Sequence, residues 1–408
     1  MRRVILNRHY IAFWFLFALL IRLIAMPMSM HVDDNFTGDL IQIAKVAQSQ
    51  DVNEFWYPPL FYYTTNLYQK VSLSGCQSVI DTAVNGTSQT STLIANPEIF
   101  CTLWSLKFWY LIFDLGVAYL LWRMFRDDKK KSRIVLLFWL LNPIIIYNAY
   151  IHGQFDVLPL FFVVLALYLA KQDRPTWAVF SIGIAASLKI YPLLFIPPAV
   201  LILSQSWRER IKLLLTGTVP FILSLLPFID EYGRNASGYG DWFFRVGYDI
   251  GFGGMVYVFF ALYAVLLWYV EHKRVQGFEA LWRVCFITLL IYYPFSYFDL
   301  HYYAWLMPFA ALYLAENPKI IKLYLFAFLC LLILLFQTPV ASFFAPISPK
   351  YFLQLPSLLE VLSPHLPILF IMNIFRSFLV GTLFWLAWLV IRDMPSSKTV
   401  SLSEGEKP

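Results

Sequence analysis

The stretch "YIAFWFLFALLIRLIAMPMSM", residues 10–30, is an apolar run interrupted by one arginine, and "HVDDNFTGD", residues 31–39, follows it directly. An apolar run of about 20 residues is long enough to cross a bilayer as a helix. Three carboxylates, Asp33, Asp34 and Asp39, therefore follow the first membrane-length segment. No small-x-small cleavage site follows the run, which favours a retained helix over a cleaved signal peptide.

Apolar runs of this kind recur along nearly all of the 408 residues, of which 60% are hydrophobic and 14% charged. The mean hydropathy is +0.63. A soluble protein of this size needs a larger polar surface, so the composition indicates an integral, multi-pass membrane protein surrounded by lipid. The net charge of +6 is typical of orientation signals in membrane proteins, and we expect no nucleic-acid partner.

The apolar runs predict an all-α bundle of about twelve transmembrane helices. They lie near residues 10–28, 105–122, 134–150, 155–170, 176–189, 191–205, 212–229, 254–270, 281–297, 302–315, 320–337 and 367–391. We expect residues 1–392 to form one polytopic domain and residues 29–104 to form a long first extracytoplasmic loop. The polar tail at residues 393–408 is predicted to be disordered and cytoplasmic.

Lysine and arginine are concentrated in five short linkers and at both termini. These linkers are residues 123–133, 171–174, 206–212, 271–283 and 316–322. The positive-inside rule places all of them in the cytoplasm. The linkers on the other side are longer and contain acids, histidines, aromatic residues and glycines, so we expect the chemistry on the extracytoplasmic face.

The three aspartates of the first outer loop are candidates for a general base or for ligands of a divalent metal. The alternative is a solvated acidic loop. The residues that follow have helical apolar spacing through Val46 and then reach "WYPPL", residues 56–60. This pattern predicts an amphipathic helix on the membrane surface, ended by a Pro-Pro turn, that forms one wall of a site.

Ionisable residues inside apolar runs are costly and therefore informative. For Arg22, Asp114 and Arg376 we favour pairing within the bundle, for example Arg22 with Asp114, over direct catalysis. Lys189 ends a predicted span on its outer side, just before Pro192. An ammonium at headgroup depth suits a lipid-linked phosphate, and snorkelling to the surface is the alternative.

Two further outer junctions contain polar residues. The motif "YIHGQFD" places His152, Gln154 and Asp156 between the third and fourth spans, and His301 lies between the ninth and tenth. No pair has the i, i+4 spacing of known zinc motifs, so binding of a sugar or phosphate is favoured over a metal site. Arg245, in a glycine-rich outer loop, is a further candidate cation for a phosphate, with simple solvation as the alternative.

The chain has four cysteines and no CxxC motif, which argues against a cysteine-based metal or redox site. Cys76 and Cys101 both fall in the first outer loop, whereas Cys285 and Cys330 lie inside apolar runs. An extracytoplasmic loop permits a disulfide between Cys76 and Cys101, and two unrelated free thiols are the alternative.

The order of these features resembles the GT-C superfamily of integral-membrane glycosyltransferases, which use polyprenyl-phosphate sugars as donors. The likeness is greatest to polyprenyl-phosphate-mannose-dependent mannosyltransferases, including the enzymes that add the first mannose of glycolipid anchors and their bacterial relatives. The stretches that carry it are "DDNFTGDLIQIAKVA", "YPPLFYY", "KFWYLIFDLGVAYLLWRMF", "LLNPIIIYNAYIHGQFDVLPLFFVVLALYLA", "WAVFSIGIAASLKIYPLLFIPPAVLIL" and "HYYAWLMPFAALYLA".

This resemblance implies an essential aspartate in the first outer loop, at Asp33 or Asp34, with Asp39 at a further acidic position of the motif. The family often spaces its acids as D-x-D, whereas Asp33 and Asp34 are adjacent here, so the choice between them stays open. The implied reaction is an inverting displacement in which the carboxylate activates an acceptor hydroxyl and polyprenyl phosphate leaves. Some relatives use a divalent metal such as Mg or Mn and others do not.

The predicted function is thus transfer of a hexose, mannose first, to a lipid-linked or other acceptor hydroxyl. The membrane would be the plasma membrane in a prokaryote and the endoplasmic reticulum in a eukaryote, with the active site extracytoplasmic or lumenal. The alternative is a transporter or flippase of lipid-linked sugars. That class often has two related halves with broken helices near the bilayer midplane, and the sequence has no such internal symmetry.

Overall fold

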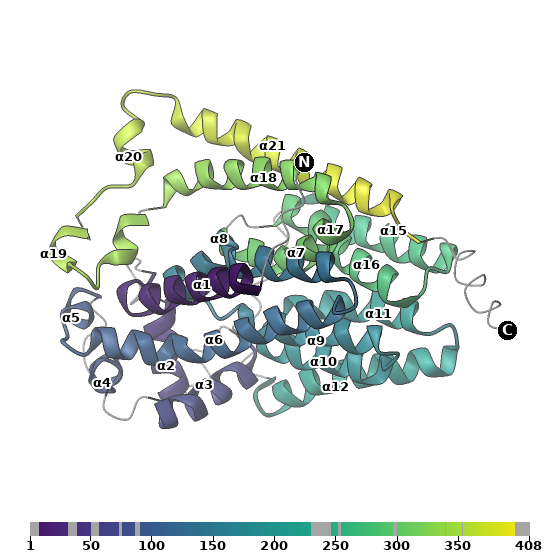
Figure 1. The fold of residues 1–408 in the computed structure, drawn as a ribbon, viewed down its shortest axis with the longest axis horizontal. Coiled ribbons are helices and arrows are strands. Elements are labelled where there is room, and N and C mark those ends of the chain that lie inside the picture. Colours follow the sequence, from purple (N-terminus) through teal and green to yellow (C-terminus); the bar gives the residue numbers. More distant parts are fainter. Residues whose placement is uncertain are drawn as a thin grey trace. The chain divides into compact units, whose positions relative to one another are not determined.

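The computed structural model describes residues 8–31, 39–49, 57–72, 76–85, 90–229, 246–251, 254–296, 300–338, 340–352 and 354–395, and nearly all of them are helical (Figure 1). Seven helical segments of the described chain are long and apolar enough to cross a membrane: Tyr10–Met28, Ile99–Met124, Lys129–His152, Trp207–Phe228, Gly277–Phe295, Pro318–Gln337 and Ile368–Arg392. The expected all-α membrane fold is confirmed. The number of about twelve spans stays a prediction, as does the disordered tail, of which only residues 393–395 are described.

The chain forms two compact units, and the first contains Met1–Asp51, Tyr62–Leu158 and Leu300–Arg376. Its helices are α1 (Arg8–Met28), α2 (Asp39–Ser49), most of α3 (Pro59–Ser72), α4 (Ser78–Asn85), α5 (Thr90–Ile94), α6 (Ile99–Met124), α7 (Lys129–Leu140), α8 (Pro143–Ile146), η2 (Tyr147–His152), η6 (Leu300–Leu306), α17 (Met307–Glu316), η7 (Pro318–Ile320), α18 (Ile321–Leu334), η8 (Leu335–Gln337), η9 (Val340–Phe344), α19 (Pro349–Phe352) and α20 (Leu358–Leu362). Helix α6 packs against α1 and α7, and α7 also packs against α17.

The segment between α1 and α6, which was predicted to be the first outer loop, contains short helices, but their boundaries differ from the prediction. Helix α2 ends at Ser49, and the Pro-Pro pair begins α3 at Pro59. Proline is well tolerated in the first turn of a helix, where its missing N–H would have no intrahelical partner. The prediction that the Pro-Pro pair ends the amphipathic helix is therefore wrong.

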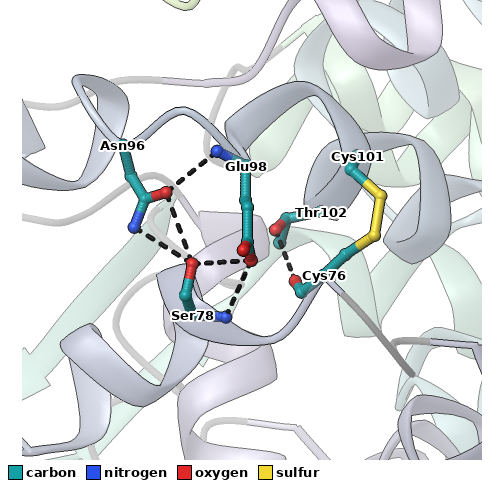
Figure 2. The surroundings of a disulfide bond; sticks show 6 residues. All are labelled: Cys76, Ser78, Asn96, Glu98, Cys101 and Thr102. Atoms are coloured by element: carbon teal, nitrogen blue, oxygen red, sulfur yellow. Dashed lines mark hydrogen bonds between the residues drawn. A yellow bond between two sulfur atoms is a disulfide. The ribbon is translucent and has the colours of Figure 1, made fainter.

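A disulfide joins Cys76, before α4, to Cys101 in the first turn of α6 (Figure 2). The Thr102 hydroxyl donates a 2.7 Å hydrogen bond to the Cys76 carbonyl. The Ser78 hydroxyl donates a 2.6 Å bond to the Glu98 carboxylate, beside the start of α6. These contacts fix the first turn of α4 to the first turn of α6. They resolve the alternatives left by the sequence in favour of the disulfide.

The second unit contains Val52–Phe61, Pro159–Asp299 and Ser377–Pro408. Its elements are most of α9 (Val157–Lys171), α10 (Pro175–Leu188), η3 (Tyr191–Phe195), α11 (Ile196–Leu203), α12 (Trp207–Leu225), η4 (Leu226–Phe228), the strands β1 (Gly247–Gly251) and β2 (Gly254–Tyr257), α15 (Val258–Lys273), α16 (Gly277–Tyr292), η5 (Tyr293–Phe295) and the larger part of α21 (Ile368–Arg392). The strands pair antiparallel, with Tyr248 opposite Val256.

Helices α10 and α12 lie side by side in this unit (Figure 1). Their backbones approach closely at Gly183 and Gly217. A Cβ atom placed on Gly183 would lie only 2.2 Å from the Gly217 carbonyl oxygen, so a larger residue does not fit there without movement of the helices. Small residues allow such close packing in membrane helices, where the hydrophobic effect contributes little to helix association.

Candidate functional site

The motif "YIHGQFD" lies at a break in the helical chain of the first unit. The Asn142 side chain accepts a 3.0 Å bond from the Ile144 N–H, and Pro143 occupies the first position of α8. Helix α8 continues into η2, a π-helix, which ends at Gly153 with φ of 90°. Glycine adopts this left-handed conformation without strain. π-Helical turns occur frequently at functional sites.

Asp156 connects η2 to η6. Its side chain is 0% exposed and accepts a 2.8 Å bond from the Asn148 Nδ2 and a 2.7 Å bond from the Trp305 Nε1. The Asn148 Nδ2 also donates a 2.9 Å bond to the His301 carbonyl. Both carboxylate oxygens of Asp156 are thus engaged in holding together two junctions that were predicted to be outer. The direct contact with the donor predicted for Asp156 stays a prediction.

Three imidazoles from three parts of the first unit lie close together, with His152 next to both of the others. The His31 and His152 rings are stacked with centroids 4.3 Å apart, and the His152 and His301 centroids are 5.1 Å apart. The Phe343 ring contacts both His31 and His152. Two histidines that were predicted to bind the donor are therefore adjacent, and His31, at the start of the acidic stretch, joins them. Gln154, two residues after His152, is buried.

The predicted pairing of Arg22 with Asp114 is confirmed. The Arg22 Nε lies 2.6 Å from the Asp114 Oδ2, and both side chains are 0% exposed. The Trp139 Nε1 and the Tyr150 hydroxyl each donate a 2.7 Å bond to the same carboxylate. Because buried charges require partners, these bonds explain how the bundle tolerates Asp114 in the middle of α6.

Lys189 lies in the second unit and immediately follows α10. Its N–H donates a 3.0 Å bond to the Ala185 carbonyl, and its side chain is buried, with the Nζ 5.5 Å from the centroid of the Tyr57 ring. A cation over an aromatic face is favourable. Tyr57 and Lys189 come from two of the stretches that carry the resemblance, "YPPLFYY" and "WAVFSIGIAASLKIYPLLFIPPAVLIL", and they meet within this unit.

Other predicted site residues lie outside the described part of the chain. They are Asp33, Asp34 and Arg245, and only the backbone of Asp39, the first residue of α2, is described. Within the described residues, no group of three or more His, Cys, Asp or Glu side chains is placed to hold a metal ion.

Sequence reasoning missed His31, Asn148, Trp305 and Lys107. Lys107 is fully buried in the first half of α6. It is seven residues before Asp114, and this spacing places both on one helix face. That periodicity was the signal that could have identified it.

Comparison with known proteins agrees with the resemblance. The model of glycosyltransferase family 87 matches residues 55–292. GPI mannosyltransferase 1 of Kluyveromyces lactis is 27% identical over 106 residues, which are 26% of this chain and 26% of that protein. The chain thus matches about a quarter of the length of this relative. The family match covers more than half of the 408 residues, and the chain therefore belongs to glycosyltransferase family 87.

Proposed function

We propose that this membrane glycosyltransferase transfers a hexose, and specifically mannose, from a polyprenyl-phosphate donor to an acceptor hydroxyl on the extracytoplasmic or lumenal face. Family membership over residues 55–292 is the observation that carries the proposal. The name of the Kluyveromyces lactis relative supports mannose as the sugar.

The ends of α6 support the orientation. Its first turn holds the Cys76–Cys101 disulfide, which persists in oxidising compartments outside the cytosol. Its other end leads into residues 123–133, which contain six basic residues, Arg123, Arg126, Lys129, Lys130, Lys131 and Arg133. Basic linkers favour the cytoplasmic side. Both signals support an extracytoplasmic position for the first loop and hence for the acidic stretch.

In the proposed reaction, Asp33 or Asp34 accepts the proton of the acceptor hydroxyl. The hydroxyl oxygen then forms a bond to the anomeric carbon as the bond from that carbon to the phosphate oxygen breaks. The phosphate leaves with the bonding electron pair, and the ammonium of Lys189 offsets its charge. His152 and His301 contribute to donor binding. The position of His31 supports this assignment, because it lies two residues before Asp33 and its ring stacks on His152.

The role of the acids is tested with purified protein, labelled polyprenyl-phosphate mannose and a panel of acceptor lipids in detergent. Asp33→Asn and Asp34→Asn are compared with Asp127→Asn, which removes an exposed carboxylate from a predicted cytoplasmic linker. We expect one of the first two changes to reduce kcat by about 100-fold or more, and the control to behave like wild type. Full transfer by both Asp33→Asn and Asp34→Asn would show that neither residue is the base.

The same assay tests Lys189. We expect Lys189→Met to raise the KM for the donor about 10-fold or more, since a charge-assisted contact to phosphate is lost. Lys212→Met is the matched control, because Lys212 is exposed on α12 and pairs with Glu209. An unchanged donor KM in Lys189→Met would exclude the phosphate role. Transfer in detergent, where no compartments exist, also separates an enzyme from a flippase.

A further inference from the structure

Lys107 is a buried cation with an unusual set of partners. Its side chain is 0% exposed, and its Nζ donates hydrogen bonds to the carbonyls of Ser29 and Tyr150, the latter at 2.8 Å. No carboxylate partner is found in the part of the chain that the structure describes. A buried ammonium without a counter-ion is costly, so the site must offer it another source of negative potential.

The C-terminal ends of two helices supply this negative potential. Ser29 immediately follows α1, and Tyr150 lies in the last turn of η2. The last carbonyls of a helix have no intrahelical partner and carry the negative end of the helix dipole. Lys107 therefore caps the C-terminal ends of α1 and η2 at the same time. This arrangement explains why the ammonium is tolerated there without a carboxylate.

Further bonds at this junction connect the same two chain segments, and one bond adds a third segment, η9. The Ser29 hydroxyl donates a 2.9 Å bond to the Tyr150 carbonyl, and the His31 N–H donates a 3.1 Å bond to the His152 carbonyl. The Met30 N–H bonds to the Phe343 carbonyl at 2.8 Å. The stacked rings of His31 and His152 lie at the end of this set of bonds. In sequence, the acidic stretch begins two residues beyond His31.

We propose that Lys107 is a positioning residue for glycosyl transfer. By holding the ends of α1 and η2 together, it fixes the stacked His31 and His152 and the point from which the chain enters the acidic stretch. The proposal rests on the proposed function, in which that stretch supplies the base. Because Lys107 is fully buried and its ammonium is bonded to two backbone carbonyls, we expect its loss to affect turnover more than donor binding.

Lys107→Met tests the proposal, and Lys107→Arg is the conservative variant because arginine retains charged donors. Tyr68→Phe is the matched control, since it removes a 2.7 Å bond to the Ser105 carbonyl of α6 without touching the junction. With labelled polyprenyl-phosphate mannose, we expect Lys107→Met to lower kcat about 10- to 100-fold with a donor KM within about twofold of wild type. We expect Lys107→Arg to recover part of kcat, and Tyr68→Phe to match wild type.

Amide hydrogen exchange provides a readout that does not depend on activity. In Lys107→Met, we expect exchange about tenfold faster in peptides covering residues 25–31 and 147–153, with residues 115–124 of α6 unchanged. Unchanged protection of both peptides would overturn the proposal, as would wild-type kcat in Lys107→Met. If wild type itself transfers no sugar, the proposed function fails, and the exchange result alone decides whether Lys107 holds the junction.

Discussion

At the residue scale, the first unit contains buried charges that each have a specific compensation. Asp114 accepts bonds from Arg22, Trp139 and Tyr150. Lys107 instead donates to the carbonyls at two helix ends. Tyr150 takes part in both arrangements, through its hydroxyl and through its carbonyl. The two buried charged residues of α6, Lys107 and Asp114, therefore both anchor η2, the turn that carries His152. Lys107 binds the Tyr150 carbonyl, and Asp114 binds the Tyr150 hydroxyl.

Removing one partner of the Arg22–Asp114 pair should be more harmful than removing both. We expect Asp114→Leu to destabilise the protein by about 3–5 kcal/mol, because it leaves the Arg22 guanidinium buried and uncompensated. The double change Arg22→Met with Asp114→Leu should recover a large part of that loss. Unfolding in detergent, followed by circular dichroism, measures both. A double variant as unstable as the sum of the two single variants would contradict the pairing.

The pairing of Arg22 with Asp114 could be predicted because both residues interrupt long apolar runs. Lys107 interrupts no long apolar run, because it lies near the start of one, where a lysine normally reaches toward the headgroups. Its seven-residue spacing from Asp114 was the one local signal that pointed to it. The bonds from Asn148 and Trp305 to Asp156 depend on how η2 and η6 pack, and their sequence separations carry no local signal. For this reason the sequence alone indicated that the Asp156 carboxylate binds the donor, and it did not reveal these two bonds.

At the element scale, Gly183 and Gly217 allow α10 and α12 to pack closely. We expect Gly183→Ala to destabilise the protein by about 1–3 kcal/mol, because the added methyl group would collide with the Gly217 carbonyl and the helices would have to separate. Gly381→Ala is the matched control within the same unit, because a Cβ there meets nothing within 4 Å. That change should be neutral or stabilising by up to about 1 kcal/mol.

Thermal unfolding in detergent compares these two glycine variants directly. Equal melting temperatures for Gly183→Ala and Gly381→Ala would show that the packing of the two helices does not depend on their close approach.

The positions of the helices could be predicted from the apolar runs, but the breaks within those runs could not. The run at residues 302–315, for example, divides into η6 and α17 near Pro308, and hydropathy detects the run without detecting the change from a 3₁₀ to an α-helix.

At the scale of the whole molecule, we infer the orientation from the contrast between the two ends of α6. A single cysteine in place of Lys70, exposed on α3, should react in sealed, right-side-out vesicles with a reagent that cannot cross the membrane. A single cysteine in place of Asp127, whose side chain is 94% exposed, should react only after permeabilisation. The free Cys285 and Cys330 are buried, which keeps the background low. The opposite labelling pattern would invert the orientation and move the acidic stretch to the cytoplasm.

The identity of the donor tests the central claim most directly. Purified wild-type protein in detergent is given acceptor lipids with either labelled polyprenyl-phosphate mannose or the corresponding nucleotide-activated mannose, and the anomeric configuration of the product is determined by NMR. We predict transfer from the polyprenyl-phosphate donor alone, with inversion at the anomeric carbon, because the proposed reaction is a single displacement. Transfer from the nucleotide sugar, or a product with retained configuration, would contradict the proposed function.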